Sequence, residues 1–110
     1  MRGIPGHGKN DLEWTTAAFI RYFCEKFPDI TAKQCPEYLV HKTGTFDGAD
    51  TWRVGCLKWR LEYEIPNLLQ KTEYGRVRDV LSEVRGAMHG AGLASWERIR
   101  RIDAEIRVEA

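Results

Sequence analysis

The chain has 110 residues, of which 43% are hydrophobic and 30% charged, so it can form one globular domain and does not resemble a disordered chain. Its formal net charge of +1 provides no overall field to attract nucleic acid or membranes. Three cysteines and the lack of an apolar N-terminal run argue against a disulfide framework and a signal peptide. We therefore expect a cytoplasmic protein with a Gly-rich leader over residues 1–9 and a single domain over 10–110.

The first predicted element is a helix from Asn10 to about Phe27. Asn10 and Glu13 match the N-x-x-E pattern of a capping box, and Pro28 follows the last turn. One side of this helix is apolar at helical spacing and suits a core, with Leu12, Phe19, Ile20, Phe23, Cys24 and Phe27.

The same helix carries a second apolar stripe, formed by Trp14, Ala18 and Tyr22 at four-residue spacing. Two interpretations remain open for this stripe. It packs under a loop of the same domain, or it contacts another chain, because a helix that is apolar on two sides touches two partners.

Residues 31–41 are expected to form a short helix that a proline interrupts in its second turn. An Asp-Gly pair at residues 47–48, flanked by Thr and aromatic residues, is typical of a hairpin turn. A short arm over 42–46 would then pair with the start of a longer strand over 51–65. The unpaired part of that strand would offer an edge for a second copy or a partner.

The strand is predicted from alternation, because apolar and charged residues take turns over 57–65. A helix is the competing interpretation, and it would separate two sets of side chains. One face would hold Trp52, Cys56, Trp59 and Tyr63, and the other Val54, Leu57, Leu61 and Ile65. We favour the strand, with Gly55 at a bulge, because a period of two is the simpler account.

Two helices are predicted in the last third of the chain. Asn67 and Gln70 match a cap for the first, which Gly90 ends, and Ser95 can cap the second. The apolar stripes are Val77, Val80, Leu81, Val84 and Met88 in the first and Trp96, Ile99, Ile102 and Ile106 in the second. The short connection predicts an antiparallel helical hairpin. The expected fold class is α+β, in the order α, short α, β-hairpin with a long second strand, α, α.

No pattern in the sequence indicates a catalytic, cofactor-binding or metal site. Residues 3–9 match part of a phosphate-binding loop, but Asn10 stands where that loop has Ser or Thr. Residues 41–45 resemble the phosphorylation motif of P-type ATPases, with His41 in place of the aspartate that forms the aspartyl-phosphate. The cysteines and histidines lack the spacing of zinc ligands. We therefore expect a protein that is not an enzyme.

These observations favour a small regulator, of bacterial or phage type, that binds another protein. It would act as an inhibitor or anti-activator that covers a surface of its target, for example a transcription factor. We expect a homodimer built on the strand edge or on the first helix. The expected interface residues are Trp14, Ala18, Tyr22, Trp52, Trp59 and Tyr63, since aromatic residues are frequent anchors of interfaces.

The alternative is a transcriptional regulator of the helix-turn-helix type. Its nucleic-acid contacts would come from Arg53, Arg60, Arg98, Arg100 and Arg101. The near-neutral charge and the acidic Glu62 and Glu64 argue against this alternative, because they weaken attraction to phosphates.

Overall fold

The computed structural model describes residues 9–34, 48–90, 92–93 and 96–109, and every regular element in these ranges is helical. The elements are α1 (Lys9–Lys26), α2 (Gly48–Trp59), the π-helix η2 (Arg60–Glu64), α3 (Ile65–Gln70), α4 (Tyr74–Gly90) and α5 (Trp96–Glu109). Because α2, η2 and α3 follow one another without a break, they form a single rod, called the α2–α3 rod below. The expected α+β fold is wrong, since the described residues contain no strand.

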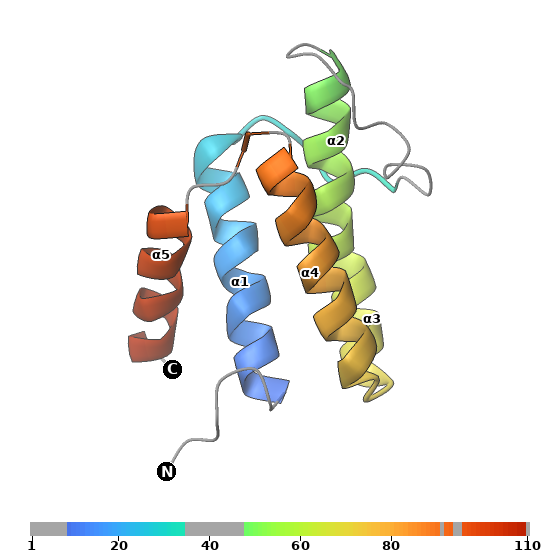
Figure 1. Ribbon diagram of the computed structural model, residues 1–110, viewed down its shortest axis with the longest axis vertical. Helices are drawn as coiled ribbons and strands as arrows, with labels where there is room; N and C mark the ends of the chain where they lie inside the picture. Colours follow the sequence, from blue (N-terminus) through green and yellow to red (C-terminus); the bar gives the residue numbers. More distant parts are fainter. Residues whose placement is uncertain (1–8, 35–47, 91, 94–95, 110) are drawn as a thin grey trace.

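When the α2–α3 rod is counted as one helix, successive helices run in alternating directions (Figure 1). Helix α1 lies between α5 on one side and the α2–α3 rod and α4 on the other. The last two helices do not form the expected packed hairpin, because α5 lies along α1 instead of along α4. Placing α1 between two layers of helix explains why its sequence is apolar on more than one side.

The first predicted helix is confirmed, with bounds one residue from those expected. Leu12, Phe19 and Phe23 are buried, and Phe27 packs against the same core. Burying a large apolar side chain of this kind stabilises a fold by about 1.5–3 kcal/mol. Cys24 differs from the prediction, because its side chain is exposed on the rim of this face.

The long predicted strand is wrong, and the helical alternative for residues 52–65 is correct. Core positions recur along the rod every three or four residues, as on one side of a helix, at Val54, Leu57, Leu61, Ile65 and Leu68, and Leu69 beside the last of them is also buried. The strand-like alternation arises because the apolar residues at every second position from 57 to 65 lie on both the buried and the solvent-facing sides of this helix. Leu57, Leu61 and Ile65 face the core, whereas Tyr63 is exposed.

The π-turn of η2 lies directly before Pro66. Proline has no N–H to donate, and its ring collides with the carbonyl four residues earlier in a regular α-helix. In η2 the N–H of Ile65 donates to the carbonyl of Arg60, five residues back, which widens the turn. The wider turn accommodates the proline ring while it keeps Leu61 and Ile65 in the core.

Gly55 is helical and does not occupy a bulge; it marks a close approach between two segments of backbone. A Cβ atom added there would lie 2.9 Å from the carbonyl oxygen of Thr31. The carbonyl of Gly55 accepts a hydrogen bond of 2.8 Å from the N–H of Lys33. Nearby, Lys58 Nζ donates to the carbonyl of Ile30 at 2.6 Å. Glycine thus lets the segment that follows α1 lie directly against α2.

Gly55→Ala should therefore lower the free energy of unfolding by about 1–3 kcal/mol, because the backbone at Thr31 must move. Gly86→Ala is the matched control, since a Cβ at Gly86 of α4 meets no atom within 4 Å. Alanine there should raise stability by about 0.5–1 kcal/mol through helix propensity. Urea denaturation measures both changes, and an increase in stability for Gly55→Ala would contradict the close approach.

The fourth helix begins later than predicted, at Tyr74, because a turn separates it from the rod. Thr72 adopts a φ of 56° in this turn. At the end of α4 the left-handed residue is Gly92, with a φ of 70°, whereas Gly90 is the last residue of the helix. The N–H of Leu93 then bonds to the carbonyl of Met88, which closes the helix end.

Two other predictions fall largely on residues outside the described ranges. Residues 31–34 are not helical, and the remainder of the predicted short helix lies outside the described residues. The predicted hairpin arm over 42–46 also lies outside them, as does the leader except for Lys9, which begins α1. The hairpin itself is excluded, because its second arm is the helical rod.

Candidate functional site

The stripe of Trp14, Ala18 and Tyr22 is covered by α5 and by the turn before it. Ala18 is fully buried and Tyr22 is 3% exposed, and the Tyr22 hydroxyl donates to the carbonyl of Leu93. Trp14 is half-buried, with the guanidinium of Arg107 stacked 5.4 Å from its ring centre. A helix of the same chain is therefore the neighbour of this stripe.

Charged side chains border the α1–α5 contact. Arg98 pairs with Glu25, and Arg21 lies 3.8 Å from Glu105. Both pairs are largely exposed and each contributes at most about 1 kcal/mol. The apolar residues between them, including Ile99 and Ile102, supply the main part of the stabilisation.

The predicted homodimer depended on two surfaces that the structure does not present. The described residues contain no strand edge, and α5 covers the stripe on α1. Of the expected interface residues, those on the α2–α3 rod remain at the surface. Trp52 and Trp59 are half-buried, while Tyr63 is 58% exposed.

Trp59 and Tyr63 stack on each other, with ring centres 6.3 Å apart and ring planes 28° apart. We call this pair the aromatic ridge. Tyr63 stands out among the described residues, because the other large hydrophobic side chains are buried or half-buried. Stacking on Trp59 restricts the tyrosine ring, so a partner would lose little side-chain entropy in binding it.

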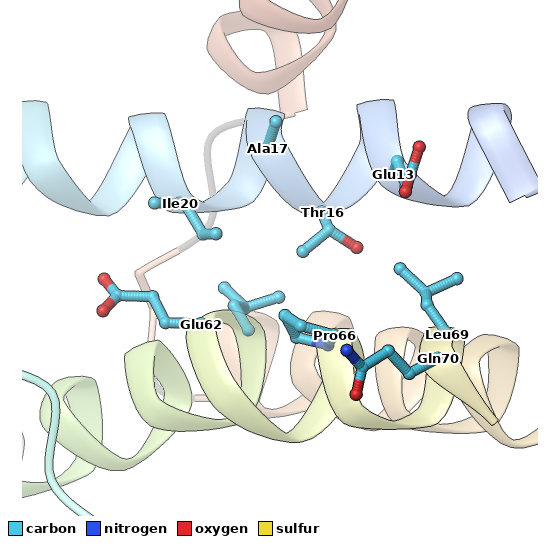
Figure 2. Close-up of a pocket in the computed structure, with 9 residues that line it drawn as sticks. Glu13, Thr16, Ala17, Ile20, Glu62, Pro66, Leu69 and Gln70 are labelled. Atoms are coloured by element: carbon cyan, nitrogen blue, oxygen red, sulfur yellow. The ribbon is translucent and has the colours of Figure 1, made fainter.

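A groove of about 480 Å³ lies between α1 and the α2–α3 rod, which run antiparallel to each other (Figures 1 and 2). Figure 2 shows Ile20 and Thr16 of α1 directed toward the rod, where Pro66 and Leu69 face them. The residues that line the groove are Glu13, Thr16, Ala17, Ile20, Leu61, Glu62, Pro66, Leu69 and Gln70.

The middle of the groove is apolar, and a carboxylate stands near each end. Glu13 lies at one end on α1, and Glu62 lies at the other end on η2 (Figure 2). No Lys or Arg belongs to the lining. Among the described side chains, Glu13 and Glu62 form no ion pair or hydrogen bond, unlike Glu64, which pairs with Arg60 at 2.6 Å.

The aromatic ridge borders the groove. Tyr63 precedes the groove residue Pro66 by three positions, and residues three apart on a helix are neighbours on its surface. The groove and the ridge therefore form one continuous surface with an apolar floor, an aromatic edge and acidic ends. We take this surface as the candidate functional site.

The arginines of the nucleic-acid alternative do not come together. Arg53 is 5% exposed, and Arg60 pairs with Glu64 and, at 2.7 Å, with Glu83. Arg98 pairs with Glu25 on the opposite side of α1, where Arg100 and Arg101 are exposed on α5. The rod thus lacks the free positive charge that a recognition helix presents to phosphates.

The described part of the chain offers no cluster of three His, Cys, Asp or Glu side chains that would suit a metal ion. Among the described cysteines, Cys24 is exposed and Cys56 is buried, and neither is in a disulfide bond. None of the helices in the described ranges combines the length and apolar character that spanning a membrane requires.

Comparisons with protein-family models, curated proteins and solved structures found no match to this chain. The inference of function therefore rests on the groove and the ridge themselves.

The groove residues were not singled out from the sequence, although they carry a signal. Glu13, Ala17 and Ile20 follow helical spacing along one side of α1, and Glu62, Pro66 and Leu69 do so on the rod. The second set is visible only when residues 52–65 are assigned to a helix. The strand interpretation ended at residue 65, so it separated Glu62 from Pro66 and Leu69 and hid the groove.

Proposed function

We propose that this protein is a non-enzymatic regulator that binds another protein through the groove and the aromatic ridge. The observation that carries the proposal is an apolar groove together with an exposed, stacked tyrosine, Tyr63, on the rod that forms one of its walls. Tyrosine and tryptophan are enriched among the residues that dominate the binding energy of interfaces.

The proposed mode of action is occlusion. A segment of the target that lies in the groove is no longer available to the target's other partners. Inhibition or anti-activation needs nothing more, and no reaction centre is required.

The acidic ends of the groove favour a protein partner over nucleic acid. Glu13 and Glu62 would repel phosphates at this surface. On the rod, Arg60 is already engaged by Glu64 and Glu83, so it offers little to a phosphate backbone.

The proposal can be tested by affinity capture from a lysate of the source cells, with the wild-type chain and two variants compared. Tyr63→Ala should lose the captured protein, because it removes the exposed side of the ridge. The double variant Arg100→Glu and Arg101→Glu changes exposed residues of α5, away from the groove, and should retain the protein.

Loss of the captured protein in the α5 variant, with retention in Tyr63→Ala, would contradict the proposal. Recovery of nucleic acid that is shed at high salt and lost in the α5 variant would instead support the nucleic-acid alternative. Circular dichroism of both variants confirms that they keep the helical fold.

A further inference from the structure

We infer that the occupant of the groove is an amphipathic helix of the partner, with Lys or Arg on both edges of its apolar stripe. This inference rests on the proposed function, because it names the partner segment that the same surface binds.

The shape of the groove favours a helix over other peptide conformations. Its walls are two antiparallel helices, and Ala17 lies at the rim of the α1 wall, where its small side chain, directed away from the rod in Figure 2, leaves room for the approach of a third helix. An added β-strand needs a sheet edge, which the described residues do not contain. A polyproline segment needs a groove whose walls are aromatic, whereas here the aromatic residues lie only on the ridge beside the groove and none of the residues that line it is aromatic.

The length of the groove matches about two helical turns. Glu13 and Ile20 are seven residues apart on α1, which corresponds to about 10 Å along the helix axis. Over this distance a docked helix presents apolar side chains at positions i, i+3 or i+4, and i+7. These side chains would meet Ile20, Pro66 and Leu69.

The two carboxylates of the groove determine which charged residues the occupant needs beside its apolar stripe. Glu13 and Glu62 stand on opposite walls and near opposite ends (Figure 2). A purely apolar or acidic occupant would remove water from these carboxylates without giving them a partner. Two basic residues about six positions apart lie about 9 Å apart along a helix axis and on opposite edges of its apolar stripe, so they would pair with both carboxylates.

A second copy of this chain does not supply such a helix in the described fold. The apolar positions of α4, including Val80 and Val84, are buried in its own core. The same holds for Ile99 and Ile102 of α5, which face α1. Neither of these described helices is therefore available from a second copy, and we assign the occupant to a different protein.

The inference can be tested with two fluorescent Ala-based peptides of about 14 residues. Both carry Leu at i, i+4 and i+7. The Leu/Lys peptide has Lys, and the Leu/Glu peptide has Glu, at two positions on opposite edges of this Leu stripe. Fluorescence anisotropy should show binding of the Leu/Lys peptide and at least about 10-fold weaker binding of the Leu/Glu peptide.

Two double variants of the protein then locate the charge effect. Glu13→Gln with Glu62→Gln should weaken binding of the Leu/Lys peptide by about 3- to 30-fold, as expected for two exposed ion pairs. Glu73→Gln with Glu97→Gln removes the same charge from exposed sites outside the groove and should leave binding within about 2-fold.

Equal binding of the two peptides, or equal weakening by the two double variants, would contradict the inference that the occupant carries basic residues. Absence of binding by both peptides would contradict the inference that the occupant is a helix. Neither result affects the proposed function, which depends on the loss of the captured protein in Tyr63→Ala.

Discussion

Tyr22→Ala should lower the free energy of unfolding by about 3–5 kcal/mol, the range typical of large aromatic side chains removed from a core. The ring of Tyr22 is 3% exposed and packs edge-on against Phe23, with ring centres 5.8 Å apart. Its hydroxyl donates to the carbonyl of Leu93, and Lys26 Nζ bonds to the same hydroxyl at 3.0 Å. Alanine would leave a cavity and remove the link between α1 and the turn before α5.

Tyr63→Ala is the matched control, because it removes the same side chain from a position that is 58% exposed. Its effect on stability should remain within about 1 kcal/mol. Urea denaturation followed by circular dichroism measures both variants. A Tyr22→Ala protein as stable as the wild type would show that α5 does not cover the stripe on α1, and the stripe would again be a candidate binding surface.

Variants at these two tyrosines allow effects on folding and effects on binding to be measured separately. Sequence spacing placed both in one expected interface, with Trp14, Ala18, Trp52 and Trp59. The structure places Tyr22 in an internal contact and Tyr63 on the aromatic ridge. A loss of binding in Tyr22→Ala would therefore follow from loss of structure, whereas a loss in Tyr63→Ala would report on the surface itself.

Ala17→Arg should weaken binding of the Leu/Lys peptide by at least about 100-fold, an effect of the size seen at interface hot spots. Ala17 lines the groove, where its small side chain leaves room for an occupant. An arginine there would fill part of this space and place a positive charge beside the basic edges of the peptide. Both effects oppose binding, so the loss of affinity should exceed that of the Glu13→Gln and Glu62→Gln double variant.

Ala104→Arg makes the same substitution on the exposed surface of α5, outside the groove, and should change binding by less than about 2-fold. Circular dichroism and urea denaturation show whether either arginine disturbs the fold. If Ala17→Arg bound the peptide as tightly as the wild type, the groove would not be the binding site.

Local patterns predicted those helices whose apolar residues follow a single periodicity. The stripe from Val77 to Met88 in α4 is buried as expected, as are Ile99 and Ile102 in α5. In α1, the capping pattern and Pro28 placed both ends within one residue. These features depend on residues that are close in the sequence, so no knowledge of the packing is needed to predict them.

The α2–α3 rod could not be assigned in this way, because its sequence fits two periods at once. Leu57, Leu61 and Ile65 satisfy a helix, but Trp59 and Tyr63 between them complete a strand-like alternation. Pro66 adds to the ambiguity, since a proline after this run usually indicates a break, and here the π-turn accommodates it. Packing against α1 and α4 decides between the two periods, and that information is not local.

The pairing of helices was equally hidden from the sequence. A short connection between α4 and α5 favours a packed hairpin, yet Gly92 and Leu93 turn the chain so that α5 lies on α1. The apolar stripe on α1 therefore had a partner that no spacing rule identifies. The groove could not be predicted either, because it exists only between two helices that are far apart in the sequence.

Binding in the groove is tested most directly by a ¹⁵N–¹H correlation spectrum of the protein during titration with the Leu/Lys peptide. We expect the largest shifts at residues 13–20 of α1 and 61–70 of the rod, with small changes at residues 96–107 of α5. The largest shifts on α5, or shifts spread evenly over the chain, would contradict the groove as the site of binding.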